Sequence, residues 1–211
     1  MTKDGTAGQA GSGTLGSGNL RERNRARTRH EIETAALDLM EAQGYSATTV
    51  EEIARRAGVS SATFFRYFPS KEDVLFASEH DSADRMVAFV AARADRSQTL
   101  AALAAPVTGF AEEILSEDGP QAHRLTRLVM TTPELAARSM RMRLRWETGI
   151  ARQLAREAGA PAPDFEQVLV ANLAVSCLAA ALWQWQRGVS PTSIASDTRR
   201  AFAAATGSSE P

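Results

Sequence analysis

The 211-residue chain has only one cysteine and three histidines. Cys177 alone can form neither an internal disulfide nor a cysteine-based zinc cluster, and its apolar surroundings predict a buried packing residue. His30, His80 and His123 are far apart and accompany no nucleophile signature, glycine-rich phosphate loop or zinc-ligand spacing. The sequence therefore predicts no enzyme, no metal and no cofactor, although distant residues could still assemble a catalytic site.

Signals for export or for membrane insertion are also lacking. The first 19 residues are polar and glycine-rich, whereas a signal peptide needs an apolar core. The longest apolar run, Val168 to Trp183, contains Asn172 and Ser176 and is shorter than the ~20 residues of a membrane span. We expect a cytoplasmic protein. Residues 1–20 are expected to form a disordered tail, because they bury too little apolar surface to offset the entropy of ordering.

The net charge is −1, yet positive charge is concentrated near the N-terminus. Between Leu20 and His30 stand five arginines and the single Glu22, a net charge of +4. This arm runs into a helix predicted at about 24–43, whose first turns are the unfavourable end for cations. Contact with a polyanion would offset that cost, and a solvated run of charge is the alternative.

Residues 48–68 predict two short helices joined by a tight turn. Thr49 and Glu52 have the spacing of a capping box, which starts the first helix. Gly58 ends this helix, because glycine takes the left-handed conformation without steric cost. Ser60 then caps the second helix. The first turn of that helix carries small residues that can approach the base edges in a DNA major groove.

The second of these helices has an inner and an outer side. Phe64 and Phe68, four residues apart, are expected to point inward. Phe65, Arg66 and Tyr67 are expected to point outward, toward a phosphate backbone. A surface hairpin without a partner is the alternative, but the agreement of caps, turn and outward chemistry favours nucleic acid.

The remaining chain shows helical segments and no strand alternation. Ser70 and Asp73 predict a further helix start, and Lys71 in its first turn is interpreted as a phosphate contact. This helix is expected to run to about Ala94 through Val74, Leu75, Val87 and Val90, and its length would let it link the DNA-binding head to the segments that follow. Further helices are predicted at about 98–116, 120–130, 133–158, 164–187 and 191–205.

In this order of elements the chain resembles the TetR family of bacterial transcriptional regulators. The resemblance covers about Arg25 to Leu75, including Thr49-Val50-Glu51-Glu52-Ile53-Ala54, Gly58-Val59-Ser60 and Thr63-Phe64-Phe65-Arg66-Tyr67-Phe68-Pro69-Ser70-Lys71. It implies an all-α homodimer of about nine helices per chain. The expected domains are a helix-turn-helix DNA-binding domain at 21–70 and a ligand-binding and dimerisation domain at 71–211. The homodimer would bind a palindromic operator and be released by a small molecule.

The resemblance also assigns roles by position. Ser61, Ala62 and Thr63 match base-reading sites, whereas Thr49, Phe65, Tyr67 and Lys71 match phosphate contacts. One departure is Phe65, where the family most often has tyrosine, so no hydroxyl is available for a phosphate. The full set of predicted DNA-binding residues is Arg25, Arg27, Thr49, Ser60, Ser61, Ala62, Thr63, Phe65, Arg66, Tyr67 and Lys71.

A fainter similarity covers Arg124 to Trp146. This segment is similar to TetR-type regulators that sense acyl-CoA-like ligands, such as those linked to mycofactocin clusters. The helix at 133–158 has a broad apolar side that includes Met140 and Leu144. Its opposite face carries Arg138, Arg141, Arg145, Arg152 and Arg156, which are either solvated or able to receive an acidic ligand group. Arg143 projects on the apolar side, so it either pairs with Glu147 or meets an anionic ligand in a pocket.

The helix at 164–187 is apolar nearly all round, so both of its sides must be covered. The protein core is expected to cover one side and a second subunit the other, with the helix at 191–205 completing the interface. A DNA-binding architectural protein without an effector and an activator remain alternatives to a repressor. The predicted ligand-binding residues are Phe89, Phe110, Met130, Met140, Arg143, Trp146 and Trp183.

Overall fold

The computed structural model of the protein describes residues 14–77, 79–116, 119–187 and 193–207. In these residues the chain forms ten α-helices and one 3-10 helix without strands, which confirms the predicted all-α fold. The elements are α1 (Thr14–Gln43), α2 (Val50–Arg56), α3 (Ser61–Tyr67), α4 (Lys71–Leu75), α5 (Glu79–Ala92), α6 (Leu100–Ser116), α7 (Gly119–Thr131), η1 (Pro133–Leu135), α8 (Ala136–Glu157), α9 (Phe165–Gln186) and α10 (Ile194–Thr206).

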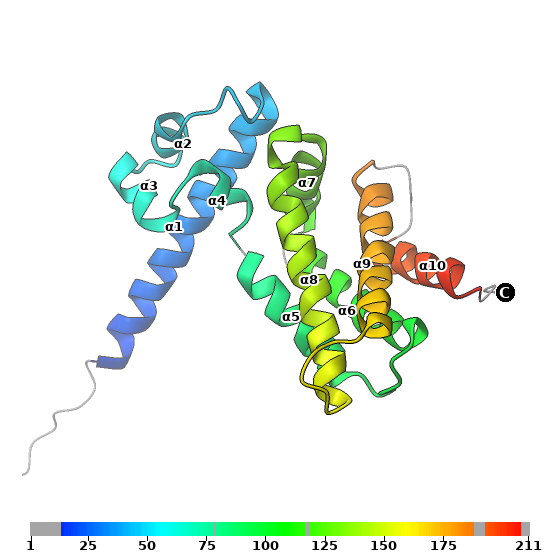
Figure 1. Ribbon diagram of the computed structural model, residues 1–211. Helices are drawn as coiled ribbons and strands as arrows, with labels where there is room; N and C mark the ends of the chain where they lie inside the picture. Colours follow the sequence, from blue (N-terminus) through cyan, green and yellow to red (C-terminus); the bar gives the residue numbers. More distant parts are fainter. Residues whose placement is uncertain (1–13, 78, 117–118, 188–192, 208–211) are drawn as a thin grey trace, which may run out of the picture.

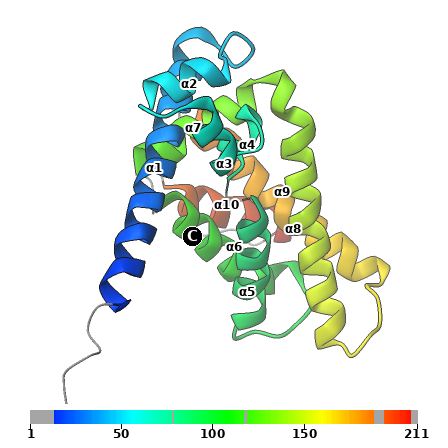
Figure 2. The ribbon, with the colours of Figure 1, turned by 90° about the vertical axis from the view of Figure 1, so that its left-hand side faces the viewer.

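Figure 1 shows two groups of helices. The first, which we call the head, consists of α1 to α4, with α2, α3 and α4 beside the C-terminal half of α1. The N-terminal half of α1 projects away from the rest of the molecule, as Figure 2 also shows. The second group, the C-terminal bundle, consists of α5 to α10, and α9 and α10 lie on the side away from α3.

Each group has a hydrophobic core. The bundle core is formed by α5, α6, α8, α9 and α10, and its fully buried side chains include Met86, Leu103, Phe110, Ile150, Leu154 and Phe202. The head core includes Ile32, Met40, Ile53, Phe64 and Phe68. Leu128 of α7 and Leu135 of η1 belong to the same buried cluster as the head core. The head is therefore packed directly on the α7–η1 side of the bundle.

The predicted single helix from Ser70 to Ala94 is wrong. Its start is correct, since the Ser70 side chain caps α4 by accepting from the Asp73 N–H, but α4 ends at Leu75 and α5 starts at Glu79. The three side chains before the break, Val74, Leu75 and Phe76, are all buried. Phe76 shares a buried cluster with Leu128 of α7, and its ring lies under the Arg138 guanidinium of α8 at 4.8 Å. Phe76 leaves the helical conformation, with φ −116° and ψ 28°.

Other helix boundaries differ less from prediction. α1 starts at Thr14, ten residues before the predicted start and inside the predicted tail, whereas residues 1–13 lie outside the described residues. Thr132 makes no side-chain cap, and Pro133 begins a 3-10 turn before α8. α10 is capped by Ser193, whose side chain accepts from the Ser196 N–H, so it starts later than predicted.

The apolar side predicted for 133–158 is only partly buried. Trp146, Ile150 and Leu154 are buried in α8, but Met140 and Leu144 are exposed, a correction to the prediction. Met140 is 66% and Leu144 58% exposed. A helical wheel cannot predict this difference, because it does not say which neighbours cover each part of an apolar side.

α9 is the one helix among the described residues whose length and composition would allow it to cross a membrane. Its inner side is packed in the protein core through Ala171, Ala174, Leu178 and Ala181. Cys177 is buried on this helix as predicted, and burial raises the pKa of its thiol. The apolar character of α9 therefore serves packing on the inner side, and its outer side is exposed.

Candidate DNA-binding surface and internal cavity

The helix-turn-helix forms through the local interactions that its sequence predicts. The Thr49 hydroxyl accepts from the Glu52 N–H at 3.2 Å, and the Glu52 carboxylate accepts from the Thr49 N–H at 3.0 Å. These reciprocal bonds confirm the capping box, and the bond from the Thr49 N–H is the main reason that the pKa of Glu52 is lowered. After α2, Gly58 takes φ +69°, a left-handed conformation that side chains other than glycine rarely adopt.

α3 is held by one cap and two inward aromatic rings. The Ser60 hydroxyl accepts from the Thr63 N–H at 3.1 Å, which confirms the predicted cap. Phe64 and Phe68 are buried and pack on each other, with ring centroids 5.9 Å apart. This anchoring fixes the direction of the opposite side of α3, where Phe65 is 52% exposed.

The predicted base-reading residues lie on the free side of α3. Ala62 is exposed, and Ser61 and Thr63 are half-buried, so no other element of the described chain seals them. Arg66 is exposed and lies over the ring of Tyr67, with its guanidinium carbon 5.6 Å from the ring centroid. In Figure 1, α3 lies at the edge of the head, away from the bundle. Contact of these residues with DNA stays a prediction.

The Lys71 side chain makes hydrogen bonds and a ring contact within the protein. Its ammonium group donates to the backbone carbonyls of Tyr45 at 2.7 Å and Thr48 at 2.9 Å. It also lies 4.3 Å from the centroid of the Tyr45 ring. The side chain thus fixes the loop before α2 whether or not it also meets a phosphate.

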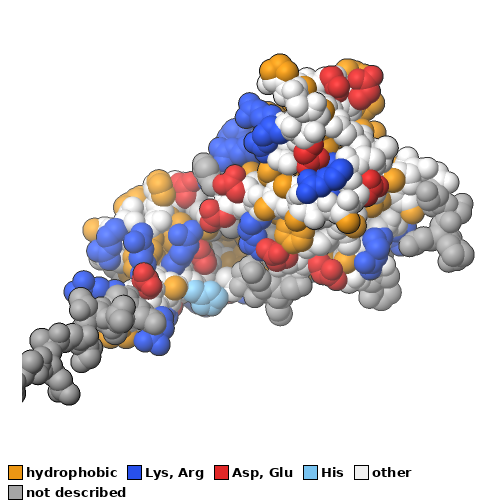
Figure 3. Space-filling view, turned by 90° about the horizontal axis from the view of Figure 1, so that it is seen from below, with side chains coloured by type: hydrophobic (Ala, Val, Ile, Leu, Met, Phe, Trp, Pro, Cys, Tyr) orange, Lys and Arg blue, Asp and Glu red, His pale blue; other side chains and the backbone are white. Residues whose placement is uncertain are grey.

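The arginine arm forms the projecting half of α1. Arg25 and Arg27 are exposed, and Arg27 makes a long surface pair with Glu31 at 3.7 Å. Figure 3 shows Lys and Arg side chains gathered over this end of the molecule. Arg29 differs, because it bonds Glu33 at 3.0 Å and lies over the Phe68 ring at 5.0 Å. The arm therefore offers exposed positive charge up to Arg27, whereas Arg29 is part of head packing.

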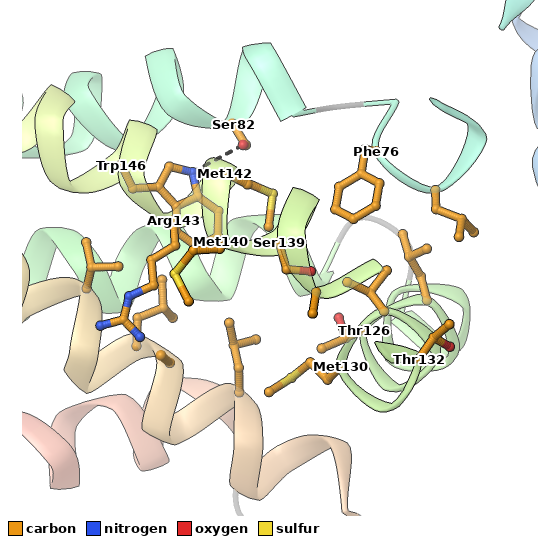
Figure 4. Close-up of a pocket in the computed structure, with 18 of the residues that line it drawn as sticks. Phe76, Ser82, Thr126, Met130, Thr132, Ser139, Met140, Met142, Arg143 and Trp146 are labelled. Carbon is orange, nitrogen blue, oxygen red and sulfur yellow. Dashed lines mark hydrogen bonds between the residues drawn. The ribbon is translucent and has the colours of Figure 1, made fainter. Parts of the chain in front are cut away.

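A cavity of about 460 Å³ lies where the head meets the bundle. Its wall is formed by α4, α5, α6, α7, η1, α8 and α9, and Figure 4 shows the side chains converging on it. Most of the wall is apolar. The lining residues are Leu75, Phe76, Ser82, Phe110, Ala111, Leu125, Thr126, Val129, Met130, Thr131, Thr132, Pro133, Ala136, Ser139, Met140, Met142, Arg143, Trp146, Val175, Leu178, Ala179 and Leu182.

Five of the seven predicted ligand-binding residues line this cavity, namely Phe110, Met130, Met140, Arg143 and Trp146. Phe89 and Trp183 do not. Phe89 lies behind Phe110, edge-on with ring centroids 6.2 Å apart, so it supports the wall from outside. Trp183 points to the outer side of α9, where it is 51% exposed and covered by the Arg187 guanidinium at 4.5 Å.

Few polar groups face the cavity. The Trp146 indole N–H donates to the Ser82 hydroxyl at 3.2 Å, a contact drawn in Figure 4. The Ser139 hydroxyl oxygen is buried and has no hydrogen-bond partner among the described residues. The Arg143 guanidinium pairs with the Glu147 carboxylate, with Nε 2.8 Å from Oε1, which is the first of the two predicted alternatives. Arg143 also lines the cavity, as the second alternative, contact with an anionic ligand, would require.

Ion pairs hold the head against the bundle. Arg124 of α7 contacts Asp38 and Glu41 of α1, each at 2.6 Å. The hydrogen bond from Arg124 is the main reason that the pKa of Asp38 is lowered. Arg138 of α8 belongs to the basic face predicted to be either solvated or able to receive an acidic ligand group, but its guanidinium reaches the Asp73 carboxylate of α4 at 2.8 Å. Charge pattern along one helix gave no sign of these partners, because they come from distant elements.

Among the residues that the structure describes, no group of three or more His, Cys, Asp or Glu side chains is placed to hold a metal ion. A capped helix-turn-helix with an exposed second helix, joined to a helical bundle with an apolar cavity, defines a DNA-binding transcriptional regulator. The chain belongs to the TetR family: residues 32–77 match the family described as "Bacterial regulatory proteins, tetR family" and residues 97–207 match "MftR C-terminal domain".

Similar proteins agree with this family. The regulator MftR of Mycobacterium tuberculosis (strain H37Rv), named for mycofactocin biosynthesis, is 32% identical over 165 residues, or 78% of this chain and 83% of that protein. The HTH-type transcriptional regulator TcmR of Streptomyces glaucescens is 35% identical over 150 residues, or 69% and 66%. The fatty acid degradation regulator FadR of Bacillus halodurans shares the fold, with a TM-score of 0.60 at 20% identity, over 86% of this chain and 99% of that one.

Proposed function

We propose that the protein is a cytoplasmic, ligand-responsive repressor. A homodimer binds a palindromic DNA operator, and a small hydrophobic or acyl-CoA-like effector in the cavity releases it. In this proposal residues 21–70 are the DNA-binding domain, and residues 71–211 bind the effector and form the dimer.

One observation carries the proposal: Leu75 and Phe76 belong to the head core and also line the cavity. A molecule in the cavity therefore touches the same side chains that position α4 beneath the helix-turn-helix. Interiors are close-packed, so a shift of these two side chains must be taken up by their neighbours in the head. An effector that binds better to a state with displaced heads shifts the population away from DNA.

The DNA side of the proposal uses the surface of α3. Ser61, Ala62 and Thr63 would read bases, and exposed Phe65 and Arg66 with half-buried Tyr67 would follow the backbone. Arg25 and Arg27 on the projecting half of α1 would reach neighbouring phosphates or the minor groove. Thr49, Ser60 and Lys71 lie at or just before the start of α2, α3 and α4 and would contact phosphates.

The effector side uses the cavity wall. Its apolar lining suits a hydrophobic ligand, and Arg143 would meet an acidic group. Phe110, Met130, Met140 and Trp146 would contact the hydrophobic part. Exposed Arg141, between the lining residues Met140 and Met142 of α8, would add positive charge for the phosphates of an acyl-CoA-like molecule.

An operator selected from random DNA would test the proposal, with release measured by fluorescence anisotropy. The screen starts with fatty acids, acyl thioesters and aromatic hydrophobes. At least one class is expected to release the operator. Arg143→Met should weaken release by acidic effectors about tenfold, the cost of one charged hydrogen bond. The matched variant Arg152→Met, at an exposed position of α8 outside the cavity, should respond like the wild type.

Two other outcomes would overturn parts of the proposal. An architectural DNA-binding protein is the better description if no candidate effector changes the operator affinity of the wild type and if the cavity-filling variant Ala179→Phe binds the operator with the same affinity as the wild type. If a reporter gene next to the operator is transcribed more strongly in the presence of the protein, the protein is an activator.

A further inference from the structure

The hydroxyl groups in the cavity wall differ in whether they already have hydrogen-bond partners. The Thr131 hydroxyl donates to the Arg127 carbonyl at 2.7 Å, and the Ser82 hydroxyl accepts from the Trp146 indole N–H at 3.2 Å. The Ser139 hydroxyl oxygen is buried and has no partner among the residues that the structure describes. Ser139 is therefore the lining residue with an unused hydrogen-bonding group enclosed in the wall.

The helix around Ser139 does not use its hydroxyl. A serine or threonine inside an α-helix can donate its hydroxyl hydrogen to the carbonyl four residues earlier. In this chain Thr131, Ser176, Thr198 and Thr206 do so. Ser139 lies four residues after Leu135, the N-cap of α8, but its hydroxyl does not bond that carbonyl. The hydroxyl thus remains available to an acceptor from outside the helix.

Ser139 also differs from the other buried hydroxyls of this kind. The hydroxyl oxygens of Thr34 and Thr108 are likewise buried without a partner in the described part of the chain. Neither of these residues lines the cavity, whereas Ser139 does. A rotation about the single Cα–Cβ bond of Ser139 is enough to bring its oxygen to a molecule in the cavity. Ser139 is therefore the member of this group that a ligand can reach.

The cavity separates this hydroxyl from its cationic group. Ser139 and Arg143 both line it from α8, four residues or about 6 Å of helix apart, and Met140 and Met142 between them line it as well. Figure 4 shows Ser139 and Thr126 of α7 on one side of the cavity, with Arg143 on the other side. The wall thus offers a guanidinium at one place, hydroxyls at another and apolar side chains between them.

We propose that the effector carries a hydroxyl or carbonyl oxygen on its apolar body, away from its acidic group, and that Ser139 together with Thr126 recognises this oxygen. This inference rests on the effector cavity of the proposed function and narrows the class of ligand. The preferred effector is an oxygenated amphiphile, and an acid with a plain hydrocarbon body binds less tightly.

The selectivity follows from the state of the hydroxyl in the free protein. A hydrocarbon body leaves the Ser139 oxygen buried and without a partner, so it gains nothing there. An oxygenated body forms a hydrogen bond in apolar surroundings, where little water competes for it. The net contribution of one such bond corresponds to about tenfold in affinity.

Matched pairs of acids test this inference without a known natural effector. Decanoic acid and naphthoic acid are each compared with forms that carry one hydroxyl at different carbons. Binding to the full-length protein is measured by isothermal titration calorimetry. At least one hydroxylated acid is expected to bind about tenfold more tightly than its parent acid.

Three variants assign this preference to its residues. Ser139→Ala should remove the preference and leave the affinity for the parent acids unchanged, and Thr126→Val should reduce it. Thr131→Val is the matched control, because it removes a lining hydroxyl that already donates to the Arg127 carbonyl, and it should keep the full preference. Circular dichroism checks the folding of each variant, and Thr126→Val provides the comparison if Ser139→Ala does not fold.

The outcomes separate this inference from the proposed function. Equal binding of parent and hydroxylated acids would overturn the inference and leave an effector-released repressor intact. A preference that persists in both Ser139→Ala and Thr126→Val would do the same. If none of the acids binds, the inference is wrong, and operator release by another compound of the screen decides whether the proposed function survives.

Discussion

The ammonium group of Lys71 is bound by two carbonyls of the loop before α2, at the position where the sequence predicts a phosphate contact. A lysine has three donors, so these bonds leave one N–H for a further acceptor. The residue can therefore position the helix-turn-helix and contact DNA at once. Thr63 differs, because its side chain lies on the free side of α3 and its backbone N–H is already capped.

Lys71→Ala and Thr63→Ala are expected to separate these roles. Lys71→Ala should weaken binding to all DNA sequences alike and reduce the slope of log affinity against log salt by about 1, the loss of one phosphate contact. Thr63→Ala should change base preference at one position of each half-site by about 1–3 kcal/mol. Binding to a random-sequence library at several salt concentrations measures both effects. Identical sequence profiles for the two variants would contradict the assigned roles.

Ser139 carries a buried hydroxyl without a partner among the described residues, beside an apolar cavity. Such a group costs about 1–3 kcal/mol when it is left unsatisfied. Ser139→Ala is therefore expected to raise the free energy of unfolding of the ligand-free dimer by about 1 kcal/mol, measured by urea unfolding at fixed protein concentration. Ala136→Ser, at an exposed lining position, is the control that should leave it unchanged. A destabilised Ser139→Ala protein would show that the hydroxyl is satisfied.

At the scale of elements, the predictions that succeeded rest on neighbouring residues. The caps by Thr49, Ser60 and Ser70 and the turn at Gly58 need only a few consecutive residues, so sequence alone could place α2, α3 and the start of α4. The break at Phe76 could not be predicted, because Phe76 shares a buried cluster with Leu128 of α7 and lies under Arg138 of α8, elements far away in the chain. The exposure of Met140 has the same origin.

The junction between α1 and α7 has a predictable pH dependence. Because Arg124 lowers the pKa of Asp38 in the folded state, this carboxylate adds stability above its ordinary pKa of 3.8, and that stability is lost as pH falls below 3.8. Asp38→Asn should lower the free energy of unfolding by about 0.5 kcal/mol near pH 7.

Urea unfolding between pH 3 and 7 would measure this difference, which should shrink toward zero at the acid end. The same series with Glu31→Gln, which removes an exposed carboxylate of α1 in a long pair with Arg27, is the control. A difference between Asp38→Asn and the wild type that is constant over the whole range would contradict the pairing with Arg124.

At the scale of the whole molecule, the sequence predicts a helical head followed by a helical bundle, and the structure has both. It does not predict how the two are joined. Leu75 and Phe76 read as ordinary apolar residues of a linking helix, yet they are shared by the head core and the cavity wall. Side chains that serve two elements emerge only when both elements are placed.

Although the net charge is −1, the exposed positive charge and the exposed apolar surface lie on different parts of the molecule. Exposed arginines occupy the projecting half of α1, and α9 at the other side has an apolar outer surface with one charged residue. We therefore expect the positive end to face DNA and the apolar side to face a second subunit. Two heads related by a two-fold axis would then read two half-sites of opposite orientation.

Hydroxyl-radical footprinting of the protein on its selected operator tests this account most directly. Two symmetric protected patches are predicted on one face of the duplex, with centres about 34–36 Å apart or somewhat more, one for each copy of α3. Thr63→Ala should alter the base preference equally in the two half-sites. A single or asymmetric protected patch would contradict the account. Protection that does not change with any substitution at Ser61, Ala62 or Thr63 would also contradict it.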